Sequence, residues 1–475
     1  IFNMQCESNA SHFFKLPLNA IPREYYLKLT PCISKKIFNG TVVISIDVEI
    51  PSKEIFIHSC GLSFTEVKLL QDSLDNICVQ IEYKKIDETV CLHFGEELQK
   101  GRAELTIIFS GKLDKNMKGL YLTSYLDSNK KIHDCLATQF EPADARRAFP
   151  CFDEPCFKAT FKIKIIYETH KTVLSNMDLE ALNLVGDGLA EYSFCVTPKM
   201  STYLVAVVIG DFDRISSSTK SGTRVSIFMP VDKVRTGIHA LTATQKIVEF
   251  YNDYFKIPYP IPKLDMVALP DISFGAMENW GLVTFREDLL LVDSKHSSTN
   301  TIQSVYLVVA HEIAHQWFGN LVTMKWWNDL WLNEGFANWI EYLAVNSCYP
   351  ELNIWRLFTV SNHCRALELD SLVNSHAIEA EITCFSELDQ IFDDITYCKG
   401  ASLINMMYNY IGDEAFSCGL KDYFELNMYK NVTTADLWQS LRMTSSKPIE
   451  LLMKSFTEQT GFPLVSVSHK KNGSS

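Results

Sequence analysis

The stretch that decides the fold reads Leu307-Val308-Val309-Ala310-His311-Glu312-Ile313-Ala314-His315. Apolar residues recur in and before it at three- and four-residue steps, at Ile302, Val305, Tyr306, Val309 and Ile313. This spacing predicts a helix that ends near Gly319. Residues four apart lie on one face of a helix, so the imidazoles of His311 and His315 can reach one metal ion. Zinc accepts such nitrogen ligands and, in a catalytic site, keeps one of four places for water.

A catalytic zinc site needs a third protein ligand, and Glu334 is the candidate. It lies nineteen positions after His315, far enough for a turn and a returning helix, which we expect over about 333–345. Glu312 is next to a ligand without being one, so it can take a proton from water and pass it to a leaving amine. Zinc polarises a carbonyl and lowers the pKa of water. The predicted chemistry is therefore hydrolysis of a peptide-like bond.

The chain before this site has the pattern of a β-rich domain. Apolar and polar residues alternate over 44–50 and again over 157–165. Strand side chains point to opposite faces with a period of two, so both segments are predicted to be half-buried strands. Further strands are predicted at 105–109 and 203–209. Several short strands at modest spacing indicate a sandwich or a saddle-like sheet, and we assign residues 1–212 to this N-terminal β domain.

The pattern becomes helical after residue 212. Two more strands are predicted at 224–229 and 266–269, and helices are predicted near 399–410 and 434–442. We therefore expect an α+β protein with a mainly helical catalytic domain over residues 213–460. We assign residues 461–475 to the start of a truncated small β domain, with an opening strand over 462–469.

Composition limits the function classes. The 475 residues are 47% hydrophobic, enough for two or three folded domains. The net charge of −13 does not attract nucleic acid or an anionic membrane surface, and no apolar run approaches the roughly 18 residues that span a bilayer. The 14 cysteines are scattered without a Cys-x-x-Cys pair. Disulfides in a secreted protein and reduced thiols in an intracellular enzyme both fit this pattern, and we favour a cytoplasmic protein. Because the chain begins with Ile1, we expect a processed or trimmed piece.

Several motifs together resemble the zinc aminopeptidases of the puromycin-sensitive type. Three of them are Gly275-Ala276-Met277-Glu278-Asn279-Trp280-Gly281, the His311 to His315 motif, and Trp331-Leu332-Asn333-Glu334-Gly335-Phe336-Ala337. Two more belong to that family's N-terminal domain, namely Gln139-Phe140-Glu141-Pro142 and Arg146-Arg147-Ala148-Phe149-Pro150-Cys151-Phe152-Asp153-Glu154-Pro155. The resemblance runs over about 16–465. It implies a saddle-like β domain followed by a thermolysin-like catalytic domain with one zinc ion.

The resemblance also implies roles for further residues. Glu278 is expected to bind the free α-amine of the substrate, with Glu141 as its partner and Gln139 beside it. Two carboxylates around an ammonium group favour a charged N-terminus over a blocked one. Tyr397 is expected to stabilise the oxyanion, because a phenol hydroxyl is a suitable neutral donor. The remaining expected contacts are Gly275 and Ala276 along the substrate backbone, Met277 and Asn279 in the same motif, and Phe274.

Phe274 is placed to line the first side-chain pocket, but packing in the core fits it equally well. The sequence ends soon after Gly461-Phe462-Pro463-Leu464, whereas family members continue into a large helical C-terminal domain, which we expect to be absent here. The leading hypothesis is an aminopeptidase that acts on peptides with free N-termini. Two alternatives stay open: a truncated peptide-binding or regulatory relative with little activity, and an epoxide-hydrolase-like relative on the same scaffold. The sequence does not predict the oligomeric state.

Overall fold

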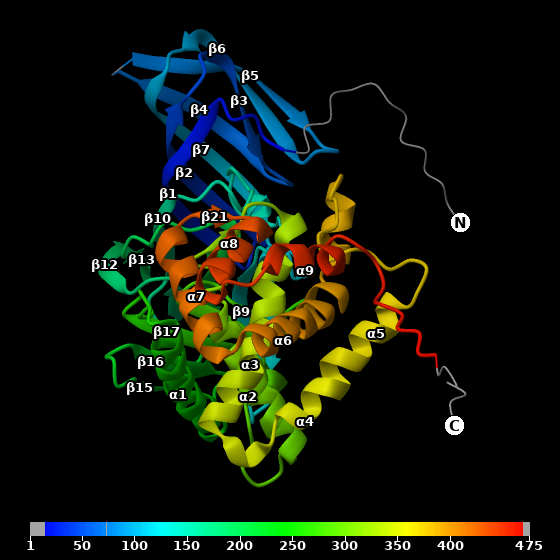
Figure 1. The fold of residues 1–475 in the computed structure, drawn as a ribbon. Helices are drawn as coiled ribbons and strands as arrows, with labels where there is room; N and C mark the ends of the chain where they lie inside the picture. Colours follow the sequence, from blue (N-terminus) through cyan, green and yellow to red (C-terminus); the bar gives the residue numbers. More distant parts are fainter. Residues whose placement is uncertain (1–14, 73, 469–475) are drawn as a thin grey trace, which may run out of the picture.

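The computed structural model describes residues 15–72 and 74–468, and these form two unlike parts (Figure 1). The blue strands extend away from the rest of the molecule, whereas the segments coloured green to red are mainly helical. The predicted α+β class, with a β-rich part followed by a mainly helical part, is confirmed. Within the described residues, no helix is both long and apolar enough to cross a membrane.

Ten strands of the N-terminal part form one sheet, in the order β12-β13-β10-β1-β2-β7-β4-β5-β6-β3. The strands are β1 (Ala20–Cys32), β2 (Ile37–Val48), β3 (Ser52–His58), β4 (Ser63–Gln71), β5 (Leu74–Lys84), β6 (Thr89–Leu98), β7 (Gly101–Lys112), β10 (Thr160–Glu168), β12 (Leu179–Gly186) and β13 (Leu189–Phe194). Alternate residues of β2, including Val42, Ile44 and Ile46, are buried. The period of two seen in the sequence therefore marks the core-facing side of the strand.

A second sheet of this part contains β8 (Gly119–Leu126), β9 (Ile132–Gln139), β11 (Thr172–Ser175) and β14 (Val207–Gly210). The strand predicted at 203–209 was wrong in its first half, because Thr202–Leu204 form a 3-10 turn. The side chain of Asn176 explains the difference. Its amide donates to the carbonyl of Leu204 at 2.7 Å and accepts from the backbone N–H of Ala206 at 2.9 Å. These backbone groups are thus satisfied without a partner strand.

The second part begins with a five-stranded sheet in the order β15-β16-β17-β19-β18. Its strands are β15 (Asp213–Ser218), β16 (Arg224–Met229), β17 (Lys263–Leu269), β18 (Ala276–Met277) and β19 (Leu282–Arg286), and β20 (Thr323–Met324) pairs separately with β21 (Asn431–Val432). The helices are α1 (Ile238–Phe255), α2 (Thr299–Ala314), α3 (Trp331–Cys348), α4 (Trp355–Phe358), α5 (Arg365–Asp370), α6 (Gly400–Ile411), α7 (Asp413–Asn427), α8 (Thr434–Ser445) and α9 (Ile449–Thr457).

Helix α3 lies very close to the start of α6. A Cβ added at Gly335 would lie 3.2 Å from the backbone of Gly400, so only glycine lets the two backbones approach in this way. The π-helical turn Ile395–Lys399 leads directly into α6. The close approach therefore brings Tyr397, which lies in this turn, to the side of α3 that carries Glu334.

Hydrogen bonds across the junction of the two parts hold the loop that contains β18. The Tyr121 hydroxyl donates to the carbonyl of Asp271 at 2.8 Å, and the Asn176 amide donates to the carbonyl of Trp280 at 3.0 Å. Gly281 has a φ of +81°, and a Cβ there would lie 2.3 Å from the carbonyl oxygen of Asn176. The chain around 271–281 is thus fixed against the N-terminal part at both of its ends.

Residues 462–468 carry no regular secondary structure. The predicted opening strand over 462–469 was therefore wrong for its described part, and residue 469 lies outside the described residues. Leu464, Val465 and Val467 are largely exposed. A β-strand needs a hydrogen-bonded neighbouring strand. A segment with alternating apolar residues does not become a strand when no such neighbour is present.

Candidate active site

Three side chains from two helices converge at the centre of the second part. His311 lies near the end of α2, His315 caps that helix, and Glu334 lies in the first turn of α3. The Nε2 atoms of the two histidines are 3.0 Å apart, and each is 3.3 Å from Oε2 of Glu334. Ligands held at about 2.0–2.1 Å from a tetrahedral zinc ion are roughly 3.3 Å apart. The three atoms therefore fit one zinc ion, and their types suit it.

The other nitrogen of each imidazole is also engaged. Nδ1 of His311 lies 2.9 Å from Oε2 of Glu341, and Nδ1 of His315 lies 2.9 Å from the carbonyl oxygen of Phe318. Each acceptor requires a proton on Nδ1, which leaves the lone pair on Nε2 facing the ligand cluster. Such outer hydrogen bonds fix both the tautomer and the ring orientation of a metal ligand.

Glu312 lies beside the cluster, and its side chain is buried. Burial raises the pKa of this carboxyl to about 8, and the nearby imidazoles of His311 and His315 lower it. Its Oε2 atom has no hydrogen-bond partner among the described residues. A divalent cation at the ligand cluster would favour the ionised form further. Glu312 is therefore placed to exchange a proton with a molecule in the cavity.

Two further glutamates face the same space from different parts of the chain. Glu141 follows β9 in the N-terminal part, and Glu278 follows β18. Carboxylate oxygens of Glu141, Glu278 and Glu334 all lie within 4.8 Å of one another. Burial raises the pKa of Glu141 well above its usual range, and the charges of Glu278 and Glu334 raise it further. Oε1 of Glu141 and Oε1 of Glu278 are both buried without a hydrogen-bond partner in the described chain.

An uncompensated charge in a protein interior is costly, so these buried carboxylates are either protonated or paired with a cation. A second metal ion at Glu141, Glu278 and Glu334 would share Glu334 with the His311–His315 cluster. An ammonium group needs only to donate hydrogen bonds to Oε1 of Glu141 and Oε1 of Glu278. The chemistry of this second cluster therefore favours an organic cation next to the metal ligands.

Tyr397 lies against the ligands from the other side. Its ring is parallel to that of His311, with centroids 6.1 Å apart and an interplanar angle of 10°. Burial raises the pKa of its hydroxyl well above the usual value, and the charge of Glu334 raises it further. The hydroxyl is therefore protonated and is a neutral hydrogen-bond donor in the cavity.

These groups line one cavity of about 400 Å³. Gly275 and Ala276 form part of its wall, where β18 is the edge strand of its sheet. Phe274 also lines it, with 39% of the side chain exposed, and its ring lies 5.9 Å from that of Phe392. The sequence left two possibilities for Phe274, namely packing in the core or lining a side-chain pocket, and its position in the cavity wall differs from core packing. The two rings form an apolar end of the cavity.

Three residues of the predicted substrate-contact set do not line the cavity. Gln139 is buried, and its amide donates to Sδ of Met277 at 3.3 Å. Met277 is buried with it, and Asn279 donates to the hydroxyl of Thr284 at 3.4 Å. These three side chains lie behind the residues that face the cavity.

The sequence alone did not identify several groups at the site. Glu341 lies seven positions after Glu334, two helical turns along α3, so helical spacing from the third ligand could have indicated it. Phe392 gave no comparable signal, because it lies in an irregular segment. Other cavity residues that were not predicted are Leu289, Val308 and Asn338.

Comparison with known proteins agrees with this arrangement. Residues 239–456 match the peptidase family M1 domain, and residues 21–204 match the peptidase M1 N-terminal domain. Aminopeptidase M1 of Arabidopsis thaliana is 44% identical over 460 residues, covering 96% of this chain and 52% of that protein. Puromycin-sensitive aminopeptidase of Caenorhabditis elegans is 40% identical over 468 residues, covering 98% of this chain and 49% of that protein. Endoplasmic reticulum aminopeptidase 1 of Homo sapiens is 38% identical over 485 residues, covering 96% of this chain and 51% of that protein. The chain spans about half the length of these relatives.

Proposed function

Because the chain belongs to peptidase family M1, we propose that it is a zinc-dependent aminopeptidase that removes N-terminal residues from peptides. The observation that carries the proposal is the pair of buried carboxylate oxygens, on Glu141 and Glu278, that accept no hydrogen bond within the described residues. They lie beside the His311–His315–Glu334 cluster, in a cavity that can hold the end of a peptide. Relatives of which the chain covers about half the length are named aminopeptidases, which supports the same activity.

The two unpartnered carboxylates select the N-terminus. A protonated α-amine carries three N–H donors and one positive charge, so it can satisfy Glu141 and Glu278 together. An acetylated or internal peptide nitrogen supplies one neutral donor. It would leave at least one buried carboxylate unpaired, a cost of about 1–3 kcal/mol or more. This difference turns a site for peptide hydrolysis into one for N-terminal residues.

His311, His315 and Glu334 would hold the zinc ion, which supplies Lewis acidity toward the scissile carbonyl and the attacking water. Glu312 takes the proton of that water. Glu312 then passes the proton to the nitrogen of the leaving peptide, so that one side chain acts first as base and then as acid. Its unpartnered Oε2 atom leaves it free to do both.

Tyr397 donates its hydroxyl hydrogen to the oxygen on which negative charge develops. Its raised pKa keeps that proton in place. Gly275 and Ala276 lie along the substrate backbone, since small residues on an edge strand allow a peptide to approach closely. Phe274 and Phe392 contact the first side chain, for which their apolar rings favour hydrophobic residues.

The proposal also includes the domain bounds, the cellular location and the roles of the residues behind the cavity wall. We propose residues 1–212 as the N-terminal β domain and residues 213–460 as the catalytic domain. A cytoplasmic location is still a prediction. None of the 13 cysteines in the described part of the chain forms a disulfide. Gln139, Met277 and Asn279 are proposed to support the cavity wall rather than to touch the substrate.

The test compares an aminoacyl reporter with its N-acetylated form, at one zinc ion per active site. We expect turnover of the free amine only. Glu278→Gln should lower kcat/KM by about 10- to 100-fold, the loss of one charged hydrogen bond of roughly 1.5–3 kcal/mol. The exposed Glu414→Gln is the matched control. Similar rates for both reporters would refute the exopeptidase proposal. Zinc binding without turnover of either would support the regulatory alternative, and turnover of an epoxide alone would support the hydrolase alternative.

A further inference from the structure

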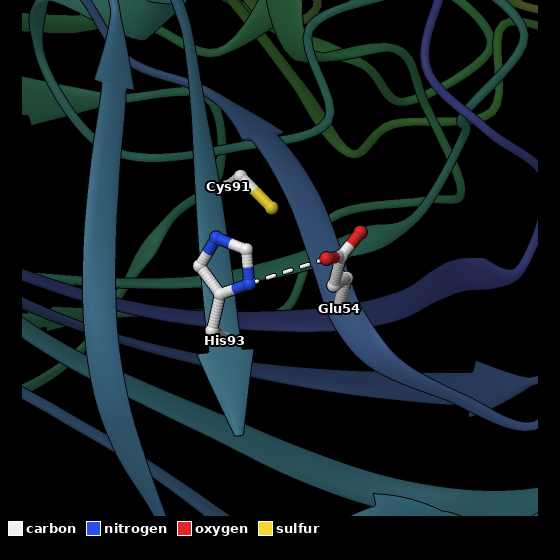
Figure 2. Close-up of side chains that lie close together, drawn as sticks. All are labelled: Glu54, Cys91 and His93. Carbon is white, nitrogen blue, oxygen red and sulfur yellow. Dashed lines mark ion pairs between the residues drawn. The ribbon is translucent and has the colours of Figure 1, made fainter. Parts of the chain in front are cut away.

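A second group of side chains with metal-ligand chemistry lies in the N-terminal sheet, far along the chain from the catalytic cluster. It consists of Glu54 on β3 with Cys91 and His93 on β6. The antiparallel register places Glu54 directly opposite His93. Cys91 is two residues before His93, so both side chains leave the same face of β6. Figure 2 shows the thiol, the imidazole and the carboxylate pointing toward one another from the two strands.

The distances within this group fit ligands of one small ion. Nδ1 of His93 lies 3.2 Å from Oε1 of Glu54, close to the 3.3 Å between each histidine and Glu334 in the catalytic cluster. The ligand atoms of all three residues lie within 4.8 Å of one another. In the view of Figure 2, the sulfur of Cys91 is directed to the side on which Nδ1 and the carboxylate lie.

Cys91 is the residue that a simple ion pair does not explain. Its side chain is only 1% exposed, and its thiol makes no hydrogen bond within the described residues. The His93–Glu54 pair alone would leave this sulfur as an apolar filler. The buried thiol of Cys91 is directed toward an imidazole and a carboxylate, and a thiolate in this position can be the third protein ligand of a metal ion.

The second nitrogen of His93 lies near a further carboxylate but makes no hydrogen bond within the described residues. Oε2 of Glu82 lies 3.5 Å from Nε2, and Glu82 is opposite Cys91 on the adjacent strand β5. His311 in the catalytic cluster differs in this respect, because its outer nitrogen, Nδ1, is hydrogen-bonded to Glu341 at 2.9 Å.

We infer that Glu54, Cys91 and His93 bind a zinc ion that is separate from the catalytic one. A thiolate, an imidazole and a carboxylate suit zinc and are poor ligands for calcium or magnesium, which take oxygen. The thiol releases its proton to solvent when the ion binds. The side chain of Glu54 is 46% exposed, so the ion reaches the site from solvent and water completes its coordination.

Such an ion would join β3 to β6. β3 is the last strand of the ten-stranded sheet, and it has a sheet neighbour on one side only. An ion that binds both strands stabilises the folded sheet, because the unfolded chain does not hold the three ligands together. The inferred role is structural and does not depend on the proposed peptidase activity.

Cobalt(II) is the probe that separates the two sites. A thiolate ligand gives cobalt an intense ligand-to-metal charge-transfer band in the near ultraviolet, and no cysteine among residues 15–72 and 74–468 lines the catalytic cavity. We expect the full chain to bind two cobalt ions and to show this band. Cys91→Ser should abolish the band and reduce the stoichiometry to one, with hydrolysis of the reporter unchanged. Cys32→Ser, which removes a thiol at the end of β1 in the same sheet, is the control and should keep both.

Glu54→Gln tests the site without disturbing the core, because this side chain is half-exposed. It should weaken cobalt binding at the thiolate-containing site by about tenfold or more, since even outer groups of metal sites contribute 10- to 100-fold. One ion per chain with no thiolate band would overturn the inference. A band that survives in Cys91→Ser would also overturn it, because another cysteine would then be the ligand.

Discussion

Replacing Glu341 by glutamine tests whether the site depends on the orientation of His311. The carboxylate of Glu341 is buried and lies 2.9 Å from Nδ1 of His311. A hydrogen bond to a charged group contributes about 1.5–3 kcal/mol, and one between neutral groups about 0.5–1.5 kcal/mol. Glutamine keeps the shape and an acceptor oxygen but loses the charge. We therefore expect zinc affinity to fall by about 1–2 kcal/mol, or about 5- to 30-fold.

The same substitution should not unfold the zinc-free chain. Burial raises the pKa of Glu341, which means that its charge is disfavoured where it lies, although His311 lowers that pKa. Removing the charge therefore relieves a desolvation cost and partly offsets the weaker hydrogen bond. The variant should separate metal affinity from stability.

Competition with a chelator of known zinc affinity measures the effect, and thermal unfolding of the metal-free protein measures stability. Glu414→Gln makes the same chemical change at an exposed position and should alter neither. At saturating zinc, the Glu341 variant should recover most of its activity on the aminoacyl reporter. An unchanged zinc dissociation constant would refute the reasoning, as would an equal loss in the Glu414 variant.

Three further predictions follow from single contacts. Tyr397→Phe should lower kcat by about 100- to 1,000-fold with little change in KM, and a change in KM alone would contradict its role as an oxyanion donor. Gly281→Ala should lower the free energy of unfolding by roughly 2–5 kcal/mol, from the left-handed backbone and the 2.3 Å approach to the Asn176 carbonyl oxygen; an unchanged urea midpoint would contradict this. Burial raises the pKa of Glu154 from 4.5 to about 7, so the folded state binds the proton of this carboxyl more tightly than the unfolded state does. The contribution of Glu154 to stability is therefore fully present below pH 4.5 and is lost as the pH rises toward 7. Glu154→Gln should therefore gain up to about 3 kcal/mol over the parent between pH 4.5 and 8, and parallel pH–stability curves would contradict this.

The helices and strands that the sequence predicted are those in which the spacing of apolar residues fits only one type of secondary structure. The strand at 224–229 and the helix that carries Glu334 agree with β16 and α3. The helix that carries His311 was also predicted correctly as α2, but its predicted end near Gly319 was wrong, because α2 ends at Ala314. Their apolar residues recur with one clear period because one face of each packs into the core. α1 and α7 were not predicted, although both bury an apolar face. In α1 the buried positions include small and polar residues such as Ala243 and Thr244, which weaken a pattern based on hydrophobicity.

The metal-ligand cluster was accessible from sequence because its spacing is local. His311 and His315 are four apart, and helix geometry alone places them on one face. The association of Glu141 with Glu278 is different, since they lie 137 positions apart (278 − 141) and meet only where the two parts of the fold join. No periodicity encodes such a contact. Family resemblance predicted it, and the geometry places the carboxylates together.

The charge balance of the cavity connects its two binding functions. It holds five carboxylates but only two imidazoles, namely Glu141, Glu278, Glu312, Glu334 and Glu341 with His311 and His315. A zinc ion at the histidines would compensate for two negative charges, which leaves three of the five carboxylates uncompensated when all are ionised. Glu334 belongs to both ligand groups, because its carboxylate lies within 4.8 Å of the histidine nitrogens and of the other two glutamates. The potential at the amine position therefore depends on whether the metal position is filled. A peptide without a charged N-terminus leaves this imbalance uncorrected, so the penalty it meets comes from the whole cluster and exceeds the loss of one hydrogen bond.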